Sequence, residues 1–126
     1  MTKTRMFLIA GALSLGAVFV AWPQASDDPL DSLKVCAATQ HLLFENQFVR
    51  VIEDSIPVGV SEARHSHRHG VVVCLTDYTV EQGFDNGPKT ISQRKANTAS
   101  WSEATIHTVK NVGTTPSHAI RIELKY

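Results

Sequence analysis

From residue 41 onward, short runs of β-branched and aromatic residues alternate with turn residues, a pattern that predicts an all-β domain. In the last of these runs, Ile120, Ile122 and Leu124 alternate with charged residues, which indicates a half-buried strand. The unbroken apolar run 71–75 instead suits a strand that is covered on both sides. Further strands are predicted over 41–44, 48–56, 61–69, 76–82, 89–95, 106–112 and 118–125, with a short element beginning at Trp101 and a tight turn at 85–88. Many short strands without a long helical pattern predict a β-sandwich or barrel.

The N-terminal residues follow a different pattern. Lys3 and Arg5 precede an apolar run, and no further charge appears until Asp27. This order predicts a secretory signal peptide over residues 1–25, or else a membrane anchor, because the run approaches the length of a spanning helix. Either alternative places the globular part in the periplasm or outside the cell, and the second tethers it to the membrane through residues 6–22.

The remaining chain divides into a lead-in over 26–40 and one domain over 41–126. Asp28-Pro29 predicts the start of a short helix over 29–38 within the lead-in. The 126 residues contain 12 basic and 12 acidic side chains, a balance that argues against a nucleic-acid-binding surface. Cys36 and Cys74 can form a disulfide in an exported protein or remain two small buried thiols, and the sequence leaves both alternatives open.

Two imidazoles stand two residues apart in one predicted strand, at His65 and His67. Residues i and i+2 of a strand share one face about 6.5 Å apart, so both rings can lean toward one divalent metal ion. His107 adds a third imidazole from a later predicted strand. A single histidine more often has a structural role, but three at this spacing predict a metal site.

The same residues carry a family resemblance. Gly59-x5-His65-x-His67 matches the first half of the first cupin motif, and His107-x3-Asn111 matches the end of the second. Residues 44–51 and 120–125 also resemble segments of small single-domain bacterial cupins. The sequence therefore resembles an exported cupin over 41–126, which implies a jelly roll or conical β-barrel and a homodimer. The resemblance also implies a metal inside the barrel, bound by the three histidines and a motif-one Glu.

The sequence departs from this pattern at the carboxylate ligand, because Val71 and Val72 stand where the motif-one Glu should fall. A divalent ion on three neutral imidazoles keeps its full charge, which favours an anionic fourth ligand from a small substrate. Such centres resemble those of thiol dioxygenases, which bind iron, although zinc, manganese, nickel or copper also suit these ligands. His69 lies on the same face, about 13 Å from His65 in a regular strand. We therefore expect it at the barrel mouth, supporting the ligands or facing the substrate.

Three functions agree with these observations. The leading hypothesis is an exported cupin that binds a divalent transition metal through His65, His67 and His107 and carries out oxygenase-like or isomerase-like chemistry on a small anionic molecule. The second is a non-catalytic cupin that captures a small molecule in its barrel. The third is a metal-free structural or partner-binding domain, tethered to the membrane by residues 6–22. Because a fold hosts many functions, the substrate has to be read from the site itself.

Overall fold

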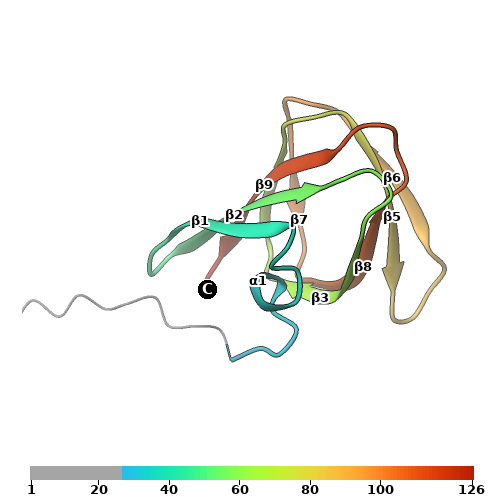
Figure 1. The fold of residues 1–126 in the computed structure, drawn as a ribbon. Coiled ribbons are helices and arrows are strands. Elements are labelled where there is room, and N and C mark those ends of the chain that lie inside the picture. The colour runs from blue at the N-terminus through green and yellow to red at the C-terminus, as the bar shows by residue number, and fades with distance from the viewer. Residues whose placement is uncertain (1–26) are drawn as a thin grey trace, which may run out of the picture.

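The computed structural model describes residues 27–126, and this part of the chain folds into two facing antiparallel β-sheets (Figure 1). One sheet has the strand order β1-β2-β9-β4-β7 and the other the order β3-β8-β5-β6. The chain passes repeatedly from one sheet to the other, so most sheet neighbours are distant in sequence. This arrangement confirms the predicted all-β fold of jelly-roll type. The strands are β1 Gln40–Glu45, β2 Val49–Ile56, β3 Ser61–His67, β4 Gly70–Cys74, β5 Tyr78–Phe84, β6 Thr90–Arg94, β7 Thr98–Ser102, β8 Thr105–Asn111 and β9 Ser117–Leu124.

The element boundaries agree with the sequence pattern where turn chemistry is strong. β5 and β6 pair as an antiparallel hairpin around the predicted turn at 85–88. Two boundaries were wrong. Trp101 lies near the end of β7 rather than at its start, and the strand predicted over 61–69 ends at His67, because the chain bends between β3 and β4.

The helix of the lead-in is shorter than predicted. α1 spans Ser32–Val35 and is capped by Asp31, whose carboxylate accepts a hydrogen bond from the backbone N–H of Leu33 at 3.0 Å. The prediction of a helix over 29–38 was wrong because Asp28 does not cap it. Its Oδ1 atom accepts instead from the backbone N–H of Leu30, at 2.8 Å, in the turn that precedes α1.

β9 shows the predicted period of two with the charged face toward the interior. Glu123 is fully buried and Arg121 lines the internal cavity. Ile120 and Ile122 lie half-buried on the outer face of the sheet, where Ile122 is the register partner of Val51 and Val71. Hydrophobicity alone would place the isoleucines inside, but the barrel interior is polar around its site.

The apolar core is small and occupies one part of the interior. Ile56, Val80 and Val109 form its buried cluster, and Tyr78 packs against them. The rest of the interior carries buried polar side chains. Burying polar groups is unfavourable unless they are paired, so this distribution marks the polar part as a candidate site.

A glycine sets the contact between β4 and β9. A Cβ atom at Gly70 would lie 1.9 Å from the backbone oxygen of Ile122. No side chain can occupy that space, so the close approach of these strands requires glycine at this position.

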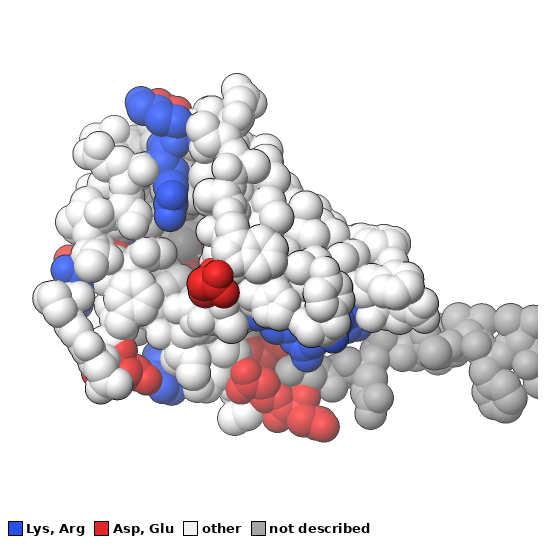
Figure 2. Space-filling view, turned by 180° about the vertical axis from the view of Figure 1, so that it is seen from behind, with Lys and Arg blue, Asp and Glu red and all other residues white. Residues whose placement is uncertain are grey.

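The predicted signal peptide or membrane anchor over 1–25 lies outside the described residues and stays a prediction. Among residues 27–126, no helix is long and apolar enough to cross a bilayer. On the face seen in Figure 2, basic and acidic side chains form small separate groups of both signs.

Candidate metal centre

The three predicted histidines meet inside the barrel. β3 pairs with β8 so that His65 lies directly opposite His107. The ring centroid of His65 lies 4.8 Å from the ring centroid of His67 and 4.8 Å from that of His107. The centroids of His67 and His107 are 5.5 Å apart. One ring nitrogen from each histidine lies within 4.8 Å of the others, and all three residues are buried. The geometry can therefore hold one metal ion.

Hydrogen bonds fix the orientation of two of the rings. His65 Nδ1 lies 2.7 Å from the carbonyl oxygen of Ala63, and His67 Nδ1 lies 2.8 Å from Glu123 Oε1. Both partners only accept, so in neutral rings each Nδ1 carries the hydrogen and each Nε2 is a bare lone pair. These two Nε2 atoms face one another at 3.0 Å. Two lone pairs at this distance repel each other unless a proton or a metal cation lies between them.

His107 completes the arrangement with no hydrogen bond of its own. Neither Nδ1 nor Nε2 has a partner in the structure, although the residue is only 4 % exposed. Burial and the neighbouring His65 and His67 lower the pKa of His107 to about 3. Burial also lowers the pKa of His67 well below its usual value, assisted by Arg121 and His65. His67 and His107 are therefore neutral near pH 7, the form that binds metals.

A buried ionic network supports His67 from behind. Glu123 Oε2 accepts from Arg50 Nε at 2.9 Å and from Arg50 Nη2 at 2.6 Å, while its Oε1 holds His67. Arg50 Nη1 also donates to Asp31 Oδ2 at 2.6 Å, so the cap of α1 is part of the same network. Carboxylates that hold the outer nitrogen of a ligating histidine fix its tautomer and raise its basicity.

A second carboxylate, Glu62, lies on the other side of His65 and was missed by the sequence analysis. Its Oε2 atom is 3.6 Å from His65 Nε2. Regular alternation would place Glu62 and His65 on opposite faces, because three positions separate them. A β-bulge between these two residues turns both inward, leaving Ala63 and Arg64 exposed. The only hint of Glu62 in the sequence was that an acidic residue lies between Gly59 and His65. No local pattern marks that residue as buried.

Glu62 is surrounded by polar groups from the start of the domain and from the lead-in. Thr39 Oγ1 and Gln40 Nε2 donate to its Oε1 at 2.5 and 3.1 Å. Cys36 lies close enough that Cys36, Glu62 and His65 form a second group with metal-ligand spacing. Burial, with the charges of Glu62 and Asp54, raises the pKa of Cys36 to about 12, so it stays a neutral thiol without an ion.

Both cysteines are free and buried, which decides between the two alternatives left open by the sequence. Cys36 lies at the end of α1 and Cys74 at the end of β4. The Cys74 sulfur lies 3.5 Å from the hydroxyl of Tyr78. Each cysteine therefore fills its own part of the interior instead of linking two segments.

Two neighbouring cavities lie beside the histidines and have several lining residues in common. The inner cavity measures about 50 Å³ and is lined by all three histidines, Glu62 and Arg121. The outer pocket measures about 270 Å³ and shares His107 and Arg121 with the inner one. The inner cavity has room for an ion with a small ligand group or a few water molecules, whereas the outer pocket has more room for the body of a substrate.

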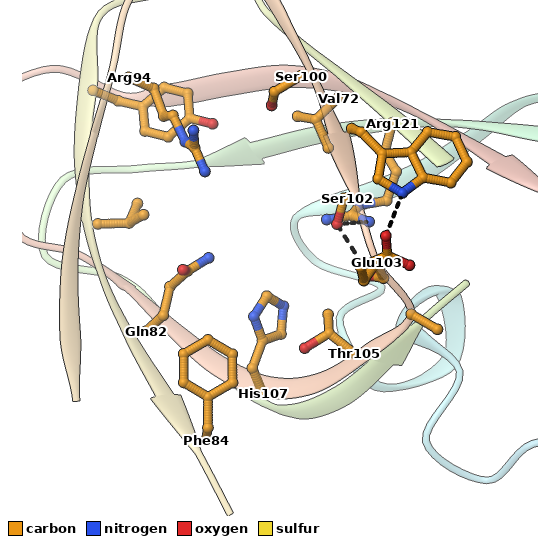
Figure 3. Close-up of a pocket in the computed structure, with 14 residues that line it drawn as sticks. Val72, Gln82, Phe84, Arg94, Ser100, Ser102, Glu103, Thr105, His107 and Arg121 are labelled. Atoms are coloured by element: carbon orange, nitrogen blue, oxygen red, sulfur yellow. Dashed lines mark hydrogen bonds between the residues drawn. The ribbon is translucent and has the colours of Figure 1, made fainter. Parts of the chain in front are cut away.

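The outer pocket is polar and basic on two sides. Arg94 from β6 and Arg121 from β9 both line it, and Figure 3 shows Arg94, Gln82 and His107 arranged around its open centre. Arg121 donates to Ser102 Oγ at 3.3 Å, and burial lowers the pKa of its guanidinium. Glu103 also lines the pocket, so two guanidinium groups face one carboxylate, and the excess of positive charge favours an anionic occupant.

His69 lies apart from the three converging rings. It sits in the bend between β3 and β4, where its ring stacks on Trp101 with centroids 5.7 Å apart and lies 6.1 Å from Tyr126. It lines a shallow surface pocket together with His67 and Tyr126. Its predicted supporting or substrate-facing role stays a prediction.

Comparisons with known proteins place the fold. The chain is similar to a cupin domain from Bordetella pertussis Tohama I, with 26% sequence identity, 69% of this chain and 92% of that chain covered, and a TM-score of 0.64. It is also similar to an RmlC-like cupin family protein with a double-stranded β-helix fold from Methanocaldococcus jannaschii, at 8% identity, coverage of 68% and 77%, and a TM-score of 0.54.

A third similar structure is a conserved protein with a double-stranded β-helix domain from Klebsiella pneumoniae, at 16% identity, coverage of 66% and 72%, and a TM-score of 0.52. No family model and no curated protein matches the sequence. The structural likenesses show that the described part of the chain has the fold of the cupin superfamily.

Proposed function

We propose that this protein, which has the cupin fold, binds one divalent transition metal ion through His65, His67 and His107 and uses it on a small anionic substrate. The observation that carries the proposal is the pair of facing Nε2 lone pairs on His65 and His67, 3.0 Å apart. With the unpartnered ring of His107 beside them, these nitrogens form a polar cluster that protein groups alone leave unsatisfied. A cation bound among them would satisfy all three.

The outer pocket supports the choice of substrate class. Its volume of about 270 Å³ suits a molecule of a few carbon atoms, and Arg94 and Arg121 would hold a carboxylate or a similar anion. His107 lies where the outer pocket meets the inner cavity. A bound divalent ion would supply Lewis acidity with open coordination positions, which suits chemistry of oxygenase or isomerase type.

Zinc, manganese, iron, nickel and copper all fit three imidazoles, so the metal should be identified by analysis of tag-free protein. In the proposed function, wild type binds close to one equivalent, and His107→Ala falls below about one-tenth of an equivalent while remaining folded. His118→Ala is the matched control, because His118 is a partly exposed histidine that contacts Glu53 at 2.8 Å, away from the cavities. Wild type that takes up no transition metal on reconstitution would exclude this function.

Activity is tested on the metal-loaded wild type. Oxygen consumption with small thiols, diketones and short carboxylic acids separates an oxygenase from a protein that only binds such molecules. An isomerase would convert its substrate without consuming oxygen. The non-catalytic alternative predicts tight binding of a small anion with no turnover in either assay.

We also propose that two copies associate through the outer face of the five-stranded sheet. An apolar row crosses all five strands of this face in register: Phe44, Val51, Ile122, Val71 and Trp101. Its two ends, Phe44 and Trp101, are 53% and 54% exposed. Contiguous exposed apolar surface is typical of association sites. Sedimentation of wild type as a dimer and of Phe44→Lys as a monomer would support this proposal, and a monomeric wild type would exclude it.

A further inference from the structure

We infer that residues 28–40, called the lead-in strap below, position His65 and His67 for the metal, so that metal binding and docking of the strap stabilise each other. This inference rests on the proposed metal-binding function. It goes beyond that function because it assigns a role at the site to a segment that contributes none of the three histidines.

The strap pairs with the strand that carries two of the histidines. β3 is an outer strand of its sheet, with β8 on one side. On its other side, the backbone N–H of Ser66 donates to the carbonyl oxygen of Leu30 at 2.7 Å, and Asp31 and Ser66 form a parallel bridge. Figure 1 shows α1 of the strap beside β3. Because Ser66 stands between His65 and His67, the strap covers the edge of β3 where both ligands are placed.

The strap also holds the support behind His67. Asp31 caps α1 with Oδ1 and accepts with Oδ2 from Arg50 Nη1 at 2.6 Å. Arg50 in turn donates to Glu123, whose Oε1 atom lies 2.8 Å from His67 Nδ1. Asp31, Arg50 and Glu123 are all buried. Three buried side chains therefore connect the cap of α1 with the outer nitrogen of a metal ligand.

On the other side of the site, the end of the strap holds the carboxylate beside His65. Thr39 Oγ1 and Gln40 Nε2 donate to Glu62 Oε1 at 2.5 and 3.1 Å. Glu62 Oε2 lies 3.6 Å from His65 Nε2. Displacement of the strap would remove the donors that orient Glu62, and this carboxylate would then move relative to His65.

The strap itself has little apolar packing to keep it in place. α1 has only four residues, whereas isolated helices shorter than about 12–15 residues are already marginal. Segments with few buried apolar contacts open locally at low cost, so docking of the strap depends on its polar contacts beside the histidines. The buried side chains of the strap, apart from the thiol of Cys36, are the polar residues Asp31, Ser32, Thr39 and Gln40.

The consequence is a reciprocal coupling between the strap and the metal. If docking of the strap raises metal affinity by some factor, bound metal must stabilise the docked strap by the same factor. Loss of a support behind a ligating histidine weakens metal binding by about 10–100-fold. Because the strap reaches the surroundings of both histidines of β3, we expect a coupling of about tenfold or more.

The first test needs no variant. Hydrogen exchange of the full chain, followed by mass spectrometry, is compared in EDTA and in saturating Zn²⁺. The amides of Cys36, Thr39 and Gln40 report on the strap, because their N–H groups donate to carbonyl oxygens within it. We expect Zn²⁺ to slow their exchange by about tenfold or more. The internal control is β6, the outer strand at the opposite edge of the same sheet, whose exchange should stay within about twofold.

The second test compares the Zn²⁺ affinity of Asp31→Asn with that of wild type by chelator competition. Asparagine keeps an oxygen that can cap α1 but loses the charge that binds Arg50. Asp77→Asn is the matched control, because Asp77 also accepts from a backbone N–H, that of Ala96 at 2.8 Å, and from a basic side chain, Lys95 Nζ at 2.7 Å, but on the surface. We expect about tenfold weaker binding or more in Asp31→Asn and binding within about twofold of wild type in Asp77→Asn.

Two results would overturn the inference while leaving the proposed function intact. One is Zn²⁺ that binds wild type without slowing exchange in the strap. The other is an Asp31→Asn protein that unfolds more easily in EDTA but binds Zn²⁺ as tightly as wild type, because Asp31 would then only stabilise the fold. If Asp31→Asn does not fold, the exchange experiment on wild type decides alone. Wild type that takes up no metal on reconstitution refutes the proposed function together with the inference.

Discussion

Glu123→Gln tests whether the network behind His67 sets the tautomer of that histidine. Glu123 now accepts three hydrogen bonds, two from Arg50 and one from His67 Nδ1. A glutamine has one oxygen and one NH₂ group, so it cannot accept on both sides. If its NH₂ faces His67, the ring must carry its hydrogen on Nε2, the atom that faces the metal position. If its NH₂ faces Arg50, the N–H donors of the amide point at the N–H donors of the guanidinium, and the hydrogen bonds from Arg50 are lost.

The two arrangements predict how much metal affinity and how much stability Glu123→Gln loses. Altering the outer partner of a ligating histidine weakens metal affinity by about 10–100-fold, which corresponds to about 1.4–2.7 kcal/mol of binding free energy. Removing one partner of a buried ion pair costs about 3–5 kcal/mol of stability. Since Arg50 keeps its contact with Asp31 at 2.6 Å, we expect the lower end, about 3 kcal/mol.

The assays are Zn²⁺ competition with a chelator, and urea unfolding of the metal-free protein in EDTA. The matched control is Glu53→Gln, which alters another carboxylate–histidine contact of 2.8 Å, with side chains 33% and 35% exposed. Exposed ion pairs contribute little to stability, so we expect the unfolding free energy of the control to change by about 0.5 kcal/mol or less. Zn²⁺ affinity within twofold of wild type in Glu123→Gln would refute the tautomer argument, whatever the effect on stability.

Three further predictions concern pH, substrate charge and strand contact. The pKa of His107 is lowered from 6.5 to about 3 in the folded protein, so its contribution to stability is complete above pH 6.5 and is lost as the pH falls below that value. We therefore expect the unfolding free energy of the metal-free protein to fall more steeply between about pH 5.5 and 4.5 than that of His107→Gln, by up to about 1.4 kcal/mol per pH unit. Equal slopes in urea titrations of the two proteins would contradict this. Arg94→Gln removes one guanidinium from the outer pocket and should weaken the binding of short carboxylates by about tenfold without changing the metal content. Binding is measured by tryptophan fluorescence, and unchanged binding would remove Arg94 from the proposed substrate site. Gly70→Ala places a Cβ 1.9 Å from the Ile122 oxygen and should destabilise the protein by about 3 kcal/mol or more. Gly87→Ala is the control and should not destabilise the protein, because the space around its Cβ position is open. Similar urea midpoints for the two variants would show that β4 and β9 can separate at Gly70.

The sequence by itself determined the fold class and the three histidines. Strand-length runs punctuated by turns specify a β-fold regardless of how the strands pair, and the hairpin of β5 and β6 follows from the residues of its turn alone. The spacing of His65 and His67 places both rings on one face, because the period of a strand is two. The position of His107 directly opposite His65 was not predicted and comes from the structure, because pairing between distant strands has no local signal.

Tertiary structure decided which polar side chains face the interior. In β9 the alternation was visible, but the buried face is the charged one, because Glu123 and Arg121 serve a polar cavity and the isoleucines cover the outside. Glu62 was invisible to periodic reasoning because a single bulge shifts its register relative to His65. A bulge depends on how two strands fit together, so no property of the local sequence marks Glu62 as a buried carboxylate beside His65.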